Sequence, residues 1–140
     1  MVQAETVARL LVAAVLGAAV GWERERAEKP VQLRDLLLVS LGAALFTVVS
    51  LQGFPGSDTG RVAAQVVTGV GFLGAGAILR LQGTVVGLTT AASIWVSAAI
   101  GLAAGAGLYL IAFLTTAISV IVLRLPRSSN SHEEGTPKER

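Results

Sequence analysis

Long apolar stretches dominate the chain, and four of them reach the length that a membrane-spanning helix needs. Such a helix requires about 20 predominantly apolar residues, within a range of roughly 17–25. The four stretches cover residues 4–22, 36–52, 62–81 and 84–123. The pattern therefore predicts an integral membrane protein and not a water-soluble domain.

The fourth stretch must turn back on itself. At 1.5 Å per residue, one helix over residues 84–123 would be about 60 Å long, which is twice the thickness of a bilayer core. Gly101, Gly105 and Gly107 lie near its middle, and glycine accepts the backbone conformations that a turn requires. We therefore expect a turn within residues 101–107 and an all-α bundle of about five transmembrane helices.

The composition agrees with this interpretation and excludes several classes of protein. Of the 140 residues, 53% are hydrophobic and only 14% are charged, whereas soluble domains carry about 25% charged residues. The absence of Cys excludes disulfides, thiol catalysis and thiolate metal sites. The single His, His132, lies in the polar C-terminal segment. Without a nucleophile–base pair, a metal-hydrolase motif or a phosphate loop, no enzymatic activity is expected.

Lys and Arg alternate between loops, and this alternation predicts the orientation. Cytoplasmic loops carry the excess of basic residues. The second loop holds only Arg61 and the fourth holds none, while the first loop, the third loop and the C-terminal segment hold Arg24, Arg26, Lys29, Arg34, Arg80, Arg124 and Arg127. We therefore expect the N-terminus outside, the C-terminus in the cytoplasm, and no binding of nucleic acid. Residues 1–125 form the transmembrane domain in this scheme, and residues 126–140 form a disordered cytoplasmic tail.

Small residues recur at helical spacing in two of the predicted helices. Lipid provides no hydrophobic driving force for helix association, so small residues are needed to let backbones approach closely. The residues concerned are Gly17 and Gly21 in the first helix and Ser93, Ser97, Gly101 and Gly105 in the fourth. GxxxG pairs serve both packing within one subunit and contact between subunits. Both uses stay open, and a homo-oligomer is expected.

The third predicted helix carries four glycines, Gly69, Gly71, Gly74 and Gly76. Three of them match the pattern GxGxxG, but a dinucleotide site needs that pattern between a strand and a helix of a βαβ unit. Two interpretations remain: close approach by neighbouring helices, or a partly unwound segment that lines a polar cavity. Close packing is the favoured interpretation.

Acidic residues at the inner membrane surface are the candidates for a cation site. Hard cations such as Mg²⁺ prefer several oxygen ligands, usually carboxylates with water. Glu23 and Asp35 can supply two such ligands. Asp35 suits the positive end of a helix dipole, which is the favoured interpretation, and alternatively a pairing with Arg24 or Arg26; Glu23 can face Arg34 or Asp35. Mg²⁺ is therefore the one cofactor that the sequence suggests.

A second polar group lies at the outer start of the third predicted helix. Asp58 suits a helix cap, and its spacing to Arg61 predicts a local ion pair. Gln65 and Thr68 continue the face of Arg61 deeper into the membrane. A buried Gln needs partners, so it either joins helices or lines a polar path. The functional polar candidates are Arg24, Arg34, Asp58, Arg61, Gln65 and Thr68.

Several blocks of the sequence, in the same order, resemble the membrane domain of the MgtC/SapB family. They include Gly21-Trp-Glu-Arg-Glu-Arg26, the run from Arg61 through Gln65 and Thr68 to Gly76, and the run from Gly87 through Ser93 and Ser97 to Gly101. The similarity extends from Gly17 to about Ala112. The family's charged and polar motif positions correspond to Glu23, Arg24, Arg34, Arg61 and Gln65.

The resemblance implies a multi-pass protein of the bacterial inner membrane that is linked to magnesium limitation and, in pathogens, to virulence inside macrophages. The member that gives the family its name is understood to restrain F-type ATP synthase. Two departures stand out. The family's Gly-Leu-Arg-Thr-His pattern is replaced by Gln32-Leu-Arg-Asp-Leu36, and we expect the C-terminal soluble domain of longer members to be missing.

Two functions follow as hypotheses. The first is regulation through helix contacts with a larger membrane complex such as F-type ATP synthase. The second is transport of Mg²⁺ or another cation, for which Glu23, Asp35, Arg61 and Gln65 supply the polar groups. The third hypothesis is a structural membrane subunit that binds no ligand.

Overall fold

The computed structural model describes residues 2–81 and 84–126. Over these residues the chain forms five helices and one short hairpin. Their bounds are α1 (Val2–Arg26), α2 (Leu33–Gly53), α3 (Gly60–Gly76), β1 (Leu79–Leu81), β2 (Thr84–Val86), α4 (Leu88–Gly105) and α5 (Tyr109–Arg124). Apart from Pro126, the predicted tail lies outside the described residues.

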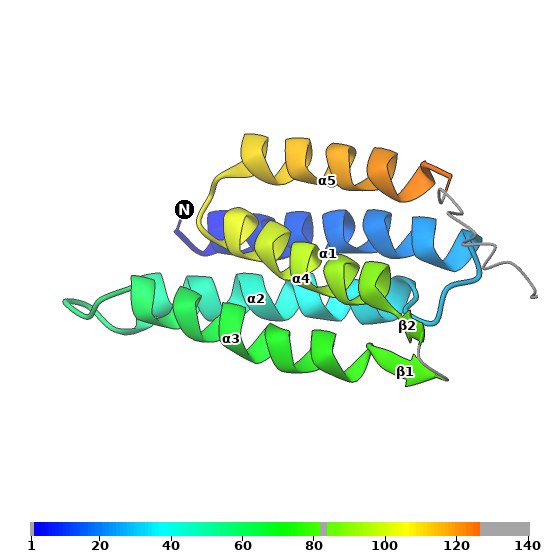
Figure 1. Cartoon of the computed structure of the whole chain (residues 1–140). Helices are drawn as coiled ribbons and strands as arrows, with labels where there is room; N and C mark the ends of the chain where they lie inside the picture. The colour runs from blue at the N-terminus through cyan, green and yellow to red at the C-terminus, as the bar shows by residue number, and fades with distance from the viewer. Residues whose placement is uncertain (1, 82–83, 127–140) are drawn as a thin grey trace, which may run out of the picture.

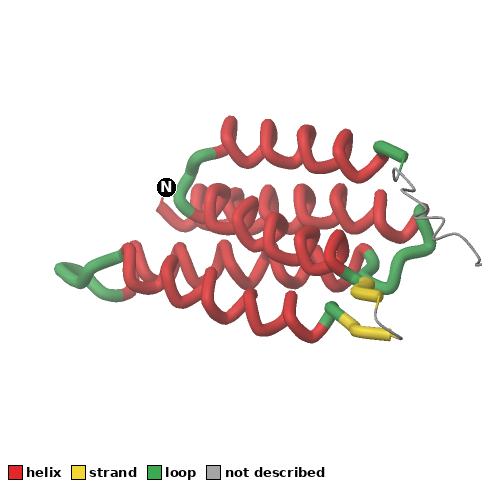
Figure 2. Tube along the Cα trace, viewed as in Figure 1, coloured by secondary structure: helices red, strands yellow, loops and turns green. Residues whose placement is uncertain are grey.

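Consecutive helices run in alternating directions, so that each connection lies at one of two ends of the bundle (Figure 1). Helices α1, α2 and α4 contact one another and form the centre, α5 packs on α1 and α4, and α3 packs on α4 and more sparsely on α2. The hairpin lies at the end where α3 finishes and α4 begins (Figure 2). The predicted all-α bundle of five helices is confirmed.

Length and composition separate the helices into two groups. The three central helices α1, α2 and α4 are long and apolar enough to cross a membrane. Helix α5 is apolar but has 16 residues, and α3 has 17, which gives each a length of about 25 Å against a bilayer core of about 30 Å. Five spans and the orientation of the termini therefore stay predictions.

The hairpin corrects the predicted bounds of two helices. The third helix was expected to reach Leu81 and ends at Gly76, and the fourth was expected from Thr84 and begins at Leu88. Between them β1 and β2 pair antiparallel, with Leu81 opposite Thr84. The β-branched run Thr84–Val86 favours a strand. Apolarity marked these residues as membrane-embedded but did not distinguish strand from helix.

Gly87 shows why α4 starts where it does. Its φ is +90°, and a Cβ at this position would overlap the carbonyl oxygen of Ala77. Only glycine suits both conditions. The turn predicted within residues 101–107 lies at the end of that range, because α4 continues through Gly101 to Gly105 and the left-handed residue is Gly107, with a φ of +81°.

The centre of the bundle is a close approach of three backbones at Ser40 of α2. A Cβ on Gly17 of α1 would lie 2.5 Å from the Cβ of Ser40, and a Cβ on Gly101 of α4 would overlap the Ser40 carbonyl oxygen. Ser40 also donates a hydrogen bond of 2.7 Å to the carbonyl oxygen of Ala13. We call this arrangement the Ser40 clamp: Ser40 held between Gly17 and Gly101.

The other two glycines of the GxxxG pairs extend the same contacts along α2. A Cβ on Gly21 would lie 2.5 Å from the Cα of Leu33, and a Cβ on Gly105 would lie 2.6 Å from the carbonyl oxygen of Ala44. Both pairs therefore serve contacts within this chain. In contrast, Gly69, Gly71 and Gly76 of α3 have no described neighbour within 4 Å of an added Cβ, and Gly74 meets only Ala91 of α4, at 3.7 Å.

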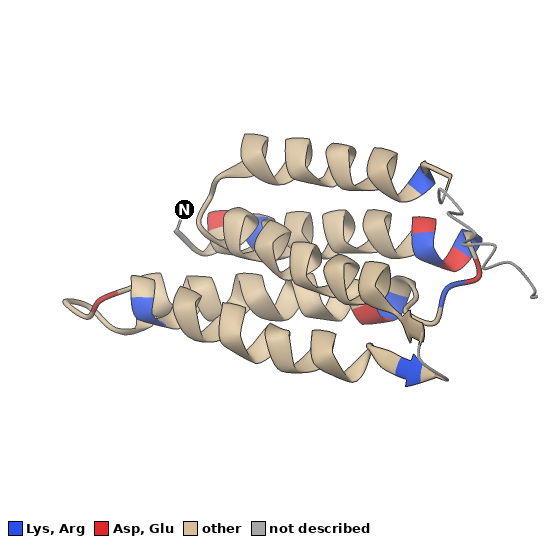
Figure 3. Cartoon of the chain, in the orientation of Figure 1, with Lys and Arg blue, Asp and Glu red and all other residues tan. Residues whose placement is uncertain are grey.

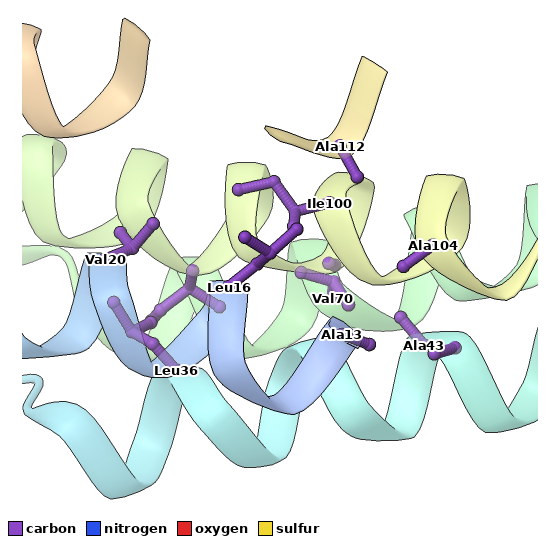
Figure 4. Close-up of a cluster of buried hydrophobic side chains, with 12 residues drawn as sticks. Ala13, Leu16, Val20, Leu36, Ala43, Val70, Ile100, Ala104 and Ala112 are labelled. Carbon is purple, nitrogen blue, oxygen red and sulfur yellow. The ribbon is translucent and has the colours of Figure 1, made fainter. Parts of the chain in front are cut away.

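The core around the clamp is built from small and medium apolar side chains (Figure 4). Its buried members come mainly from α1, α2 and α4 and include Ala13, Leu16, Val20, Leu36, Ala43, Ile100 and Ala104. Val70 of α3 and Ala112 of α5 reach it from outside. Buried hydroxyls accompany them, and Ser93 satisfies its own by donating to the carbonyl oxygen of Thr89 at 2.7 Å. Because these side chains are small, the helices are held together by close backbone contact and not by the burial of large side chains.

Replacing Gly101 by Ala should destabilise the bundle, because the new Cβ would collide with the α2 backbone at Ser40. Overpacking of this kind costs about 1–3 kcal/mol, although Ala alone favours a helix by about 1 kcal/mol over Gly. Thermal unfolding of the purified protein in detergent measures the difference. Gly71→Ala is the matched control, since an added methyl group there meets nothing described. Equal losses in both variants would contradict the clamp.

Candidate functional site

Charged residues of the described chain gather at the two ends of the bundle and leave its middle free of charge (Figure 3). The end where α1 finishes, which we call the basic end, carries Arg24, Arg26, Lys29, Arg34, Arg80 and Arg124. The opposite end carries Arg9 and Arg61 with Glu5 and Asp58. The distribution places the candidate sites at the two ends of the bundle.

Arg24 is the one buried charged residue in the described part of the chain, with 4% of its surface exposed. Its guanidinium Nη2 donates to the Thr90 Oγ of α4 at 3.0 Å. Thr90 is itself buried in the first turn of α4. The bond joins α1 and α4 at the basic end, so the buried charge of Arg24 holds two helices together and is not presented to solvent.

Glu23 and Arg124 form an ion pair at the same end. The Nε of Arg124 in α5 lies 2.9 Å from a carboxylate oxygen of Glu23 in α1. Glu23 is largely buried while Arg124 is 60% exposed, and pairs with an exposed partner contribute little to stability. Glu23 was expected to face Arg34 or Asp35, and this expectation is wrong because the C-terminal end of α5 packs beside α1.

Asp35 acts as a helix cap. Its carboxylate accepts a hydrogen bond of 2.9 Å from the backbone N–H of Gln32, and together they form a capping box at the start of α2. This position agrees with the favoured interpretation of Asp35 as an acid at the N-terminal end of a helix. Arg34 next to it is exposed.

The described residues do not fit a resident Mg²⁺ ion at this end. Glu23 is engaged by Arg124 and Asp35 by the α2 backbone. In the ranges 2–81 and 84–126, no three acidic or His side chains gather closely enough to hold a metal ion. Because Mg²⁺ requires several oxygen ligands, these two carboxylates do not make a shared site.

The opposite end is fixed by Arg9. Its guanidinium forms the ion pair with Glu5 that the i, i+4 spacing favours. It also donates to the carbonyl oxygen of Gly105 at 3.0 Å, so that it binds the C-terminal end of α4. Arg9 therefore links α1 to the turn between α4 and α5 and has a structural role.

Asp58 and Arg61 do not form the expected ion pair. The Asp58 carboxylate accepts the backbone N–H of Gly60 at 2.9 Å, which caps the first turn of α3. Arg61 is exposed, and no ion pair to it is found among the described residues. The correction has a simple reason: the carboxylate satisfies a helix-terminal amide that would otherwise lack a partner.

Arg61 and Gln65 line one end of an apolar groove between α2 and α3. The groove has a volume of about 690 Å³, and its walls come from residues 38–46 of α2 and residues 61–73 of α3. All its other lining residues are apolar or glycine. It forms because α3 packs chiefly on α4 and only sparsely on α2. Gln65 is exposed in this chain and lies in the wall of the groove, not between packed helices.

A different face of α3 points away from the bundle. Its exposed members include Ala64, Thr68, Gly71, Phe72 and Ala75, and Phe72 is 81% exposed. Thr68 bonds only within its own helix, donating to the carbonyl oxygen of Ala64 at 3.1 Å. We call these five residues the outer face of α3. Four of them are small residues, the type that allows two helices to approach closely.

Sequence reasoning missed two of the polar links. It did not find Thr90 as the partner of Arg24, or the Gly105 carbonyl as an acceptor for Arg9. Each link joins residues more than 60 positions apart, so spacing alone gave no signal. The two adjacent hydroxyls in the first turn of α4, Thr89 and Thr90, were the available hint.

Comparison with known proteins gives a consistent family match. The chain matches the MgtC family over residues 10–131. It is 45% identical over 130 residues to "Putative magnesium transporter YhiD" of Escherichia coli K12, covering 87% of this chain and 60% of that protein. It is 47% identical over 109 residues to "Protein MgtC" of Salmonella typhimurium 14028s, covering 78% of this chain and 47% of that protein. No solved structure gives a significant match.

An uncharacterised protein of Haemophilus influenzae is 41% identical over 127 residues, covering 84% of this chain and 53% of its own length. The chain thus spans 47% to 60% of the length of these three relatives. The family match over residues 10–131 includes the residues of the basic end and of the groove.

Replacing Thr90 by Val should destabilise the protein, because it removes an acceptor from the buried guanidinium of Arg24. Losing one partner of a buried charged group costs about 1–3 kcal/mol. Thr90→Ser keeps a hydroxyl at the same place and is the matched control. Thermal unfolding in detergent compares the two. If Thr90→Val were as stable as Thr90→Ser, the bond would not hold α1 to α4.

Proposed function

Because this chain belongs to the MgtC family, we propose that it is a regulatory protein of the bacterial inner membrane that acts through helix contacts with a larger membrane complex such as F-type ATP synthase. The family resemblance suggests the complex. The outer face of α3 carries the proposal, since it offers a surface for a partner's transmembrane helix.

The outer face of α3 differs from the other lipid-facing surfaces in its side chains. Helix α5 presents large residues to its surroundings, such as Leu110, Ile118 and Ile121. The outer face presents one large side chain, Phe72, beside small residues such as Gly71 and Ala75, and a Cβ on Gly71 would meet nothing described. Small residues let a second backbone approach, whereas large ones suit lipid chains.

The centre of the bundle supports a contact role over conduction. The three central helices approach at the Ser40 clamp so closely that even a methyl group would collide. Charged side chains of the described residues lie at the ends and not along the middle (Figure 3). A conducting path for a hard cation needs polar ligands along its length, so one chain is a poor pathway.

Cation transport is the second candidate, and one relative's printed name, "Putative magnesium transporter YhiD", favours it. In this alternative several copies would surround a path, with Arg61 and Gln65 of each chain near its outer mouth. The purified protein in liposomes separates the two candidates. Flux of Mg²⁺, Na⁺ or H⁺ that exceeds empty liposomes would favour transport over regulation.

The proposed orientation places the basic end in the cytoplasm. Six of the eight Lys and Arg residues in the described part of the chain lie at that end, in agreement with the positive-inside rule. The two shorter helices α3 and α5 then cross with local thinning of the bilayer or with flanking polar residues at its surfaces. The N-terminus lies outside in this arrangement.

A contact on the outer face should be detectable by cross-linking, because the chain has no Cys of its own. Ala75→Cys, joined to a thiol-reactive photo-cross-linker in native membranes, should capture one membrane protein in stoichiometric amount. Val122→Cys on the lipid-facing side of α5, 56% exposed, is the matched control. Mass spectrometry identifies the captured chain. Capture of a subunit of ATP synthase supports the proposal, and equal, heterogeneous capture by both variants counts against it.

The absence of Cys from the natural sequence also allows the orientation to be tested with single Cys substitutions. Asp58→Cys should react with a membrane-impermeant maleimide added to intact spheroplasts, and Lys29→Cys should react only after the membrane is opened. The two positions lie at opposite ends of the bundle. The reverse pattern of labelling would overturn the proposed orientation.

A further inference from the structure

We propose that the groove between α2 and α3 binds one anionic phospholipid, with its phosphate on Arg61 and one acyl chain along the apolar walls. The proposal concerns the groove and not the outer face of α3, so it is independent of the regulatory role.

The groove presents groups that complement a phospholipid, in the order phosphate, ester and acyl chain. Arg61 lies at its polar end, Gln65 follows one turn deeper, and the walls beyond them are apolar. A guanidinium presents a planar fork of donors that matches a phosphate. The amide of Gln65 can donate to an ester carbonyl of the glycerol backbone, and the remaining length accepts hydrocarbon.

The length of the groove matches one leaflet of a bilayer. From Arg61 to Leu73 the α3 wall rises over 12 residues, which is about 18 Å of helix. Half of a bilayer core measures about 15 Å. A lipid whose phosphate sits at the level of Arg61 therefore reaches the end of the groove with its acyl chain.

Two glycines leave room in the groove for the acyl chain of the lipid. Gly42 of α2 and Gly69 of α3 both line the groove, and a Cβ on either would meet nothing within 4 Å among the described residues. The volume of about 690 Å³ lies within the usual range of roughly 300–1,000 Å³ for sites that bind small molecules. An apolar hollow of this size does not stay empty in a bilayer, since its walls would lose their contacts.

Charge decides between a lipid and a second copy of this chain. A second copy would need an acidic group to pair with Arg61, but Glu5 is bound by Arg9 and Asp58 caps α3. These are the two acidic residues of the described chain at that end (Figure 3). A phosphodiester brings its own negative charge. A helix of a second copy, about 10 Å wide, would instead cover Arg61 with apolar surface.

Native mass spectrometry of the full chain, purified in detergent and stripped of lipid, tests the proposal. Added phosphatidylglycerol should bind as one tightly held molecule per chain, and phosphatidylcholine should bind more weakly. Arg61→Gln should weaken the binding of phosphatidylglycerol about tenfold, the loss expected for one charged hydrogen-bonding partner. Arg80→Gln, which removes a cation from the basic end, should leave it unchanged.

Filling the groove gives a second, independent measurement. Gly69→Val places a side chain inside it and should abolish the tightly held lipid, while Gly71→Val adds the same side chain on the outer face and should not. Gly42→Val repeats the test from the opposite wall, and thermal unfolding checks that each variant is folded. Equal lipid loss in Gly69→Val and Gly71→Val, no preference for phosphatidylglycerol, or a dimer that Gly69→Val alone disrupts would overturn the proposal.

Discussion

The close approach of three backbones at Ser40 is the constraint on which the rest of the structure depends. Gly17 and Gly101 leave no room for a Cβ against Ser40, so α1, α2 and α4 are held at a fixed separation by contact alone. Inside a bilayer this is a sound basis for a fold, because apolar surface gains nothing from leaving lipid. The polar links at the ends, Arg24 with Thr90 and Arg9 with the Gly105 carbonyl, then fix how the helices are rotated and aligned.

Helix α3 lies outside that clamp, and its position explains where function can reside. It packs on α4 and only lightly on α2, which leaves one side open as a groove and another side as a face of small residues. The closely packed helices α1, α2 and α4 determine the shape of the bundle, whereas α3 offers surfaces that a partner or a ligand can contact. Both proposals therefore fall on α3, on two separate sides of it, without requiring that the tightly packed centre move.

The sequence predicted most of the architecture and less of the site. Apolar length identified the helices, and the spacing of Gly17, Gly21, Gly101 and Gly105 anticipated the central contacts, because both signals are local. The hairpin was missed because its strands, Leu79–Leu81 and Thr84–Val86, lie at the ends of two long apolar stretches that were assigned to helices. The partners of Glu23 and Asp58 were assigned wrongly, since a carboxylate near a helix end can bind a distant Arg or a nearby amide, and tertiary packing decides which. That Gly69 and Gly71 face open space could not be read from glycine content, which looks the same in a packed helix.

The position of Gly101 has a consequence for how the protein is made. Ser40 and Gly17 emerge early from the ribosome, but the clamp is complete only when α4 follows, after α3 and the hairpin have been synthesised. Helix α3 is therefore synthesised before the helix on which it mainly packs. Until α4 has been made, α1 and α2 can contact each other while α3 lacks its main partner. The clamp closes only with α4, and α5 packs on α1 and α4 later still.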